Sequence, residues 1–99
     1  MKMNYSDGTL TVALTGELDH HSAAYLRNRI DRDLLQKRPD RLVLDFSAVT
    51  FMDSSGVGLV LGRYKKAGEM NCAVSVSGLN ERDGRMMKLA GLQKLIEFR

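Results

Sequence analysis

Two adjacent serines, Ser54 and Ser55, stand in the segment with the clearest potential for chemistry, FMDSSGVGLVLGRYK at residues 51–65. An aspartate precedes them and an apolar, glycine-spaced run follows them, which is the pattern of a helix start. A hydroxyl at such a place can cap the helix or act as a nucleophile. Each of these chemistries needs other groups nearby, and the rest of the chain decides among them.

Catalysis and metal binding find little support in the chain. A serine nucleophile needs a base, and His20 and His21 are the only histidines. The G-x-S-x-G pattern of a nucleophile elbow is absent around Ser55, and so is the phosphate-binding pattern G-x-x-x-x-G-K-[ST]. Asp19 and the two histidines could hold a metal ion, but adjacent histidines on a helix point about 100 degrees apart. We therefore predict no catalytic residue, no metal site and no cofactor, and a protein that is not an enzyme.

Composition excludes several further classes of function. The 99 residues suffice for one ordinary domain, and 43% hydrophobic with 27% charged residues is a globular composition. The net charge of +3 is spread along the chain, which argues against binding of nucleic acid or of a membrane surface. No apolar run could span a bilayer, and the first ten residues show no secretory signal. The lone Cys72 excludes an internal disulfide, so we expect a cytoplasmic protein.

Hydrophobic periodicity predicts the strands that would position these residues. Alternating or continuous apolar runs favour strands at residues 2–5, 9–15, 41–46, 72–76 and 95–98. The turn signal Asp7-Gly8 joins the first two in a hairpin. The strand at 41–46 is nearly continuous in apolar residues, which is typical of a central strand that is covered on both faces.

Three helices are predicted between the strands, over residues 22–37, from the serine pair to Gly68, and from Asn80 to about residue 90, before Gly91. Asp19 or Ser22 can cap the first helix, and Asp53, Ser54 or Ser55 can cap the second. Strands that alternate with helices predict a single α/β domain over residues 1–99, a mixed β-sheet of four to five strands packed by α-helices.

Helix phase separates the two serines. Ser54 lies three and seven residues before members of the buried stripe, whereas Ser55 lies three and seven residues before Gly58 and Gly62. Each glycine inside a helix lowers its stability by roughly 0.5–1 kcal/mol relative to alanine, so the presence of two glycines on one face needs an explanation. One reason is close packing of the helix on the sheet. The other is close approach of another protein to a hydroxyl at the helix tip.

Three segments resemble the STAS-domain anti-sigma-factor antagonists: GELDHHSA at 16–23, FMDSSGVGLVLGRYK at 51–65 and MMKLAGLQKLIEF at 86–98. The double histidine resembles the sporulation branch more than the general-stress branch. The resemblance implies a STAS domain that binds an anti-sigma factor and so frees a sporulation sigma factor. That anti-sigma factor would also be a serine kinase, ATP- or ADP-bound, which inactivates the antagonist by phosphorylation. A PP2C-type phosphatase would restore it.

The resemblance also implies the site residues. The phosphorylated residue is the serine of the Ser-Gly pair, which is Ser55 here. The expected partner-binding residues lie at two helix starts: Asp19, His20, His21, Asp53, Ser54, Ser55, Gly56, Gly58 and Gly62. By residue type alone, the first three would be a helix cap and solvated imidazoles. Family members usually continue with a further C-terminal helix that residues 1–99 lack, which leaves the cover of one sheet face undecided.

Two other functions stay open at this point. STAS domains also occur as ligand- or nucleotide-sensing modules, which need not keep a phosphorylatable serine at the position of Ser55. A phosphocarrier would pass the phosphoryl group onward, but serine phosphates are poor donors and no activating base or metal ligand lies nearby in the sequence. The leading prediction is therefore a binding protein that is switched by phosphorylation.

Overall fold

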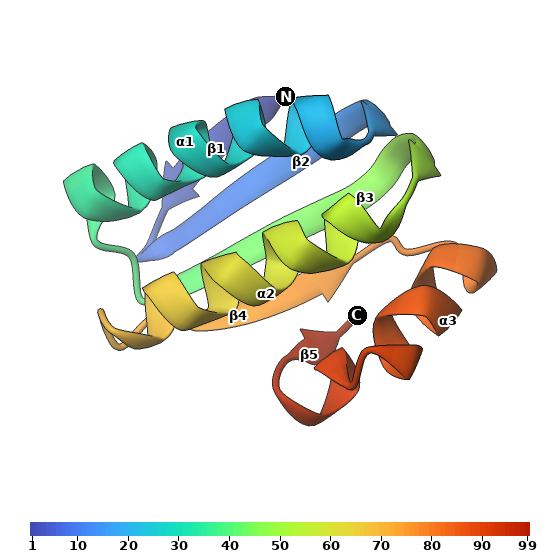
Figure 1. The fold of residues 1–99 in the computed structure, drawn as a ribbon. Helices are drawn as coiled ribbons and strands as arrows, with labels where there is room; N and C mark the ends of the chain where they lie inside the picture. The colour runs from blue at the N-terminus through green and yellow to red at the C-terminus, as the bar shows by residue number, and fades with distance from the viewer.

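The computed structural model describes residues 1–99 and shows a five-stranded sheet with three α-helices (Figure 1). The strands are β1 (Lys2–Ser6), β2 (Thr9–Leu18), β3 (Arg41–Met52), β4 (Ala73–Ser77) and β5 (Glu97–Phe98), in this order across the sheet. The helices are α1 (His20–Lys37), α2 (Ser54–Gly68) and α3 (Glu81–Leu89), and the short 3₁₀ helix η1 (Leu92–Lys94) follows. β1 is antiparallel to β2, and all other neighbouring strands are parallel. None of the helices combines the length and the apolar character that a membrane crossing requires.

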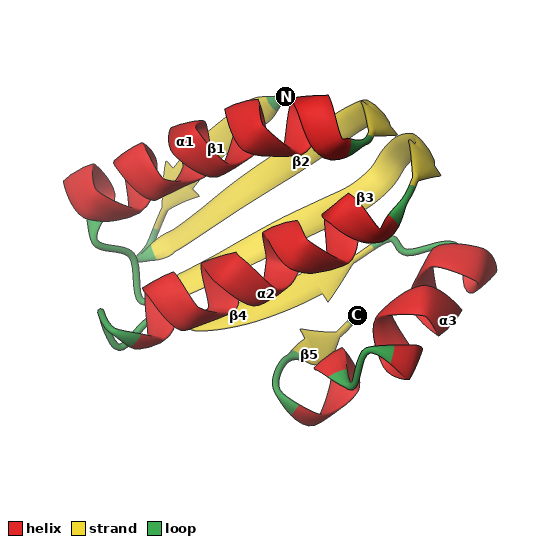
Figure 2. Cartoon of the chain, in the orientation of Figure 1, coloured by secondary structure: helices red, strands yellow, loops and turns green.

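The core lies between the sheet and the helices. Figures 1 and 2 show α1 and α2 side by side across one face of the sheet. Every second residue of the central strands points into this layer and is almost fully buried: Leu10, Val12 and Leu14 of β2, and Leu42, Leu44 and Phe46 of β3. The buried residues of α1 recur every four positions, which gives the helix one apolar stripe toward the sheet.

The opposite face of the sheet is polar. Its middle row of paired residues consists of Asn4, Thr11, Val43, Ser75 and Glu97. Val43 is only 8% exposed, although it lies outside the core cluster. Its partners in the neighbouring strands, Thr11 and Ser75, are polar. Figure 1 shows α1 and α2 on the other face, so the prediction that this strand is covered on both faces holds for the burial of Val43 and not for a second layer of helices.

The predicted boundaries need small corrections. Asp7 and Gly8 both have positive φ, 52° and 78°, as the predicted hairpin turn requires. α1 begins at His20 instead of residue 22, and β3 continues to Met52 instead of ending at residue 46. The last strand has only two residues. The predicted α/β fold with a mixed sheet is confirmed, and β3 is its central strand.

The parallel pairing of β2 with β3 brings two helix starts together. Leu18 and Met52 are the last residues of their strands, and they are partners in the sheet. Asp19 and Asp53 follow them directly, and each begins a helix. Because parallel strands end at the same edge of a sheet, the first turns of α1 and α2 are neighbours, at the right in Figure 1.

Candidate functional site

The start of α1 is held by a reciprocal cap. The Asp19 carboxylate accepts a hydrogen bond from the backbone N–H of Ser22 at 2.9 Å, and the Ser22 hydroxyl accepts one from the N–H of Asp19 at 3.0 Å. The same hydroxyl donates to the Glu17 carbonyl at 2.9 Å, which ties the helix to β2. The bond from Ser22 N–H holds the pKa of Asp19 below its ordinary value of 3.8. Both predicted cap residues therefore act together.

The start of α2 is capped by Asp53. Its Oδ1 accepts a hydrogen bond from the backbone N–H of Ser55 at 2.8 Å. Ser54 and Ser55 are the first two residues of the helix, and neither hydroxyl is hydrogen-bonded within the chain. The interpretation of either serine as the cap is therefore wrong, and the half-buried Ser55 hydroxyl is available for other chemistry.

A backbone hydrogen bond joins the two helix starts, because the N–H of Asp53 donates to the carbonyl of Leu18 at 3.2 Å. Gly56 packs tightly beneath the same junction. A Cβ at Gly56 would collide with the Met52 side chain and would lie 3.1 Å from Cδ2 of Leu18. The segment that carries Ser55 is thus fixed against the ends of β2 and β3. Gly56 itself is buried, so it allows the close packing at this junction but exposes no surface that a partner could contact.

A groove of about 370 Å³ lies between α1 and α2, and it is lined by His20, Ala23, Ala24 and Arg27 of α1 and by Ser55, Gly58, Leu59, Gly62 and Arg63 of α2. A Cβ at Gly58 or at Gly62 would meet nothing within 4 Å. Close packing on the sheet is therefore not the reason for these two glycines. They form an open wall beside Ser55, the serine that helix phase places above them.

An ion pair crosses from α1 to α2 two turns beyond Ser55. Nε of the buried Arg63 lies 2.8 Å from Oδ1 of Asp31, although its N–H is not directed well enough at that oxygen for a hydrogen bond. Burial lowers the pKa of the Arg63 guanidinium, the charge of Asp31 opposes this effect, and the charge of Arg27 adds to it. Arg27 itself forms no ion pair with a carboxylate. Of these two guanidinium groups beside the groove, only that of Arg63 is paired with a carboxylate.

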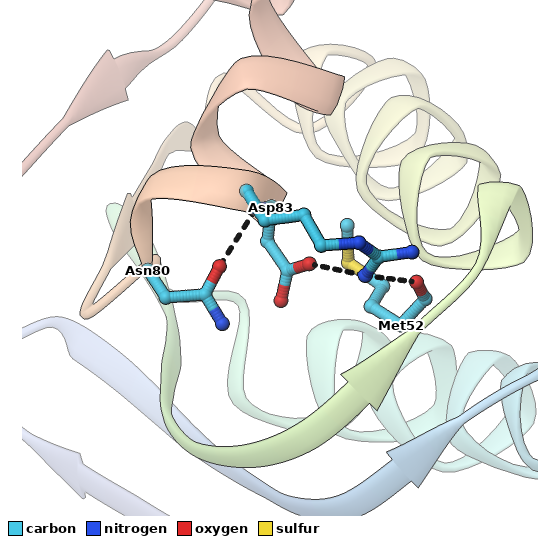
Figure 3. Close-up of polar contacts among 4 residues, drawn as sticks. Met52, Asn80 and Asp83 are labelled. Carbon is cyan, nitrogen blue, oxygen red and sulfur yellow. Dashed lines mark hydrogen bonds and ion pairs between the residues drawn. The ribbon is translucent and has the colours of Figure 1, made fainter.

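The other side of the junction contacts α3. Figure 3 shows the Asn80 side chain directed at the backbone of Asp83, and the Asp83 carboxylate and the Met52 carbonyl on either side of a guanidinium group. Asn80 accepts a hydrogen bond from the N–H of Asp83 at 2.7 Å, and Arg82 donates to the Met52 carbonyl and to the Asp83 carboxylate, both at 3.2 Å. The Arg82 guanidinium also lies 5.8 Å from the centre of the Phe51 ring. The sequence contains no local signal for this contact, which joins residues 30 positions apart.

The structure gathers most of the predicted site residues at one end of the domain. His20 and Ser55 line the groove from its two walls, whereas His21 and Ser54 are exposed beside it. Asp19 and the two histidines do not form a group that could hold a metal ion. The arrangement is therefore a surface with an accessible hydroxyl at the start of α2.

Comparisons with known proteins point the same way. The chain matches the STAS domain over residues 1–99. It is 34% identical over 96 residues to the anti-sigma F factor antagonist of Paenibacillus polymyxa, which covers 97% of this chain and 82% of that protein. It is 30% identical over 98 residues to the anti-sigma-B factor antagonist of Bacillus subtilis (strain 168), which covers 99% of this chain and 86% of that protein.

Solved structures show the same fold. The anti-sigma factor antagonist SpoIIAA in its unphosphorylated form superposes with a TM-score of 0.86 at 27% identity, over 99% of this chain and 86% of that one. The Bacillus cell fate determinant SpoIIAA in its phosphorylated form gives a TM-score of 0.78 at 27% identity, over 99% and 89% of the two chains. From its sequence, its sheet order and these matches, the chain belongs to the STAS domain family, in the group of anti-sigma factor antagonists.

Proposed function

We propose that this chain is an anti-sigma-factor antagonist that acts by binding and has no catalytic activity of its own. In its unphosphorylated state it binds an anti-sigma factor that is also a serine kinase, with ATP or ADP bound, and so frees a sporulation sigma factor. The kinase transfers the γ-phosphoryl group of ATP to Oγ of Ser55, ADP leaves, and binding ends. A PP2C-type phosphatase hydrolyses the phosphoserine and restores the antagonist. The names of the relatives support the first of these statements.

The observation that carries the proposal is the setting of the Ser55 hydroxyl. It stands at the start of α2 without a hydrogen bond inside the chain, beside a wall made by Gly58 and Gly62. A kinase can reach such a hydroxyl without unfolding the helix, because the Asp53 cap does not depend on it. The missing side chains on the glycine wall allow the backbone of a partner to come close.

The neighbouring residues supply the proposed contact surface. Asp19 is half-buried in its cap, and His20 and His21 are exposed on the first turn of α1. Across the junction, Asp53 is half-buried and Ser54 is exposed. A partner that covers Ser55 would touch both helix starts together, because these starts are neighbours.

The proposed switch works through charge. Phosphorylation adds a charge of about −1.5 to −2 to Ser55, and the amide dipoles of a helix N-terminus favour an anion there. Like charges across an interface cost several kcal/mol, and roughly 1.4 kcal/mol corresponds to a tenfold loss of affinity. A phosphoryl group that faces the nucleotide of the kinase therefore releases the partner without refolding the antagonist.

Phosphorylation-site mapping tests this function. The parent, Ser54→Ala and Ser55→Ala are incubated with ATP and the anti-sigma kinase of the same organism and are analysed by intact mass and peptide mapping. We expect one phosphoryl group on the parent and on Ser54→Ala, and none on Ser55→Ala. Modification of Ser55→Ala at Ser54 would contradict the site. Absence of both binding and modification in the parent would contradict the function.

A further inference from the structure

Two rows of residues face each other across the groove between α1 and α2. His20 and Arg27 lie two turns apart on one flank of α1, and both line the groove. On α2, Ser55, Gly58 and Gly62 succeed one another at spacings of three and four residues. The hydroxyl of Ser55 thus shares one groove with an imidazole and a guanidinium group.

The groove has room for a phosphoryl group next to that hydroxyl. Its volume is about 370 Å³, and space is open at both glycines, where a Cβ would have no neighbour within 4 Å. The opposite wall carries the small side chains of Ala23 and Ala24. A phosphoryl group on Ser55 can therefore turn into the groove without displacing a side chain.

The groove also holds positive charge that is only partly balanced. Arg63 is 6% exposed, and its one carboxylate neighbour, Asp31, receives no well-aligned hydrogen bond from its Nε. Arg27 has no carboxylate partner, and the imidazole of His20 makes no hydrogen bond within the chain. The two like-charged guanidinium groups are close enough for Arg27 to contribute to the lowered pKa of Arg63. An anion bound here would offset that repulsion.

The helix end beside Ser55 carries a carboxylate, and the groove wall does not. Asp53 accepts the N–H of Ser55 at the end of the helix, so its carboxylate would repel a phosphoryl group placed there. Asp53 does not line the groove, whose charged lining residues are Arg27 and Arg63.

From this difference we propose that the phosphoryl group of phosphorylated Ser55 turns into the groove between α1 and α2, where Arg27 and His20 hold it. The inference rests on the proposed phosphorylation of Ser55 and adds the place where the added group resides. Arg27 then acts as a positioning residue of the phosphorylated state. It keeps the phosphoryl group between the two helix starts, on the surface that a partner has to cover.

Protein with phosphoserine installed at position 55 by genetic code expansion tests the inference without any kinase. Titration followed by ³¹P NMR gives the pKa of the phosphomonoester in the parent, Arg27→Gln, Arg27→Lys and Arg32→Gln. Arg32 is an exposed residue of α1 outside the groove, so its removal is a control for net charge. We expect the pKa of the phosphoserine to be lower in the parent, Arg27→Lys and Arg32→Gln than in Arg27→Gln, because a nearby cation favours the dianion.

Denaturant unfolding of the same proteins, with and without the phosphoryl group, gives a second measure. Phosphorylation should raise the unfolding equilibrium constant about two- to fivefold more in Arg27→Gln than in the parent, the size of an exposed ion-pair coupling. Equal phosphoserine pKa values in all four proteins, without such coupling, would overturn the inference. Since the phosphoserine is installed directly, failure here is distinct from failure of the kinase experiment, which concerns the function alone.

Discussion

The carboxylate of Asp53 accepts the backbone N–H of Ser55 at 2.8 Å, while the Ser55 hydroxyl has no partner within the chain. The residue that stabilises the start of α2 is therefore not the residue whose chemistry is proposed to change. This separation makes folding stability and switching independently measurable at two positions that are only two residues apart.

Replacing each residue by alanine should separate the two roles. Asp53→Ala removes the cap of α2 and should lower the free energy of unfolding by about 1 kcal/mol. Ser55→Ala removes no hydrogen bond and should stay within about 0.5 kcal/mol of the parent. Urea unfolding of both variants measures the difference. An equal loss from the two substitutions would show that the serine hydroxyl also supports the helix.

A carboxylate at position 55 should act on binding rather than on folding. Ser55→Asp places an anion at the helix start, where the amide dipoles favour it and Asp53 opposes it, so we expect folding stability close to that of the parent. Its affinity for the anti-sigma kinase should fall about tenfold or more relative to Ser55→Ala, through like charges at the nucleotide site. Calorimetric titration with nucleotide present measures both affinities. If the two variants bind equally well, release by charge is wrong.

Two glycines of α2 should respond in opposite directions to alanine. A Cβ at Gly62 meets nothing within 4 Å, so Gly62→Ala should raise the free energy of unfolding by roughly 0.5–1 kcal/mol through helix propensity. A Cβ at Gly56 collides with Met52, and Gly56→Ala should lower it by about 1–3 kcal/mol. Thermal unfolding of the two variants shows whether each substitution raises or lowers stability. We also expect Gly62→Ala to weaken partner binding, and an unchanged affinity would remove the groove from the interface.

The ion pair between Asp31 and Arg63 should matter more than a surface pair. Asp31→Ala leaves the buried guanidinium unpaired, and we expect a loss of about 3 kcal/mol, at the low end for buried pairs because the aspartate side chain is 26% exposed. The double variant Asp31→Leu with Arg63→Met should recover most of that loss. Glu81→Ala, which breaks an exposed pair with Arg85, is the control and should change stability by about 0–1 kcal/mol. Equal effects of the two single substitutions would contradict the burial argument.

The cap of α1 should give the stability of the domain a pH dependence of known sign. The bond from the N–H of Ser22 holds the pKa of Asp19 below 3.8 in the folded chain. The ionised Asp19 carboxylate therefore stabilises the fold fully above the pKa that Asp19 has in the unfolded chain. This stabilisation is lost as the pH falls through the lower pKa that Asp19 has in the folded chain. The difference in free energy of unfolding between the parent and Asp19→Asn should accordingly shrink below about pH 4. Urea unfolding across the acid range tests this, and a constant difference would count against it.

Much of the fold was predictable because most elements carry a local signal. The Asp7-Gly8 turn fixes the first hairpin, and Asn80 with Gly91 brackets α3. The polar far face was not predictable from the run RLVLDF, because the position of Val43 relative to other strands decides its burial.

For the site, the sequence was enough to predict on which face of α2 Ser55 lies, but not which residues contact one another. The spacing of Ser55 from two glycines was enough to place it on their face of α2. The choice of Asp53 as cap was open, because three adjacent residues of similar capping ability compete for it. The contact of Arg82 with the Met52 carbonyl depends on how α3 folds back against β3, which no local spacing encodes.

The hydrogen bond from Asp53 N–H to the Leu18 carbonyl has a kinetic consequence. It ties the two helix starts to each other, so we expect a partner that docks on both to order no loop when it binds. Association should then proceed at the rate of rigid docking, about 10⁵–10⁷ M⁻¹s⁻¹, and differences in affinity should appear in the lifetime of the complex.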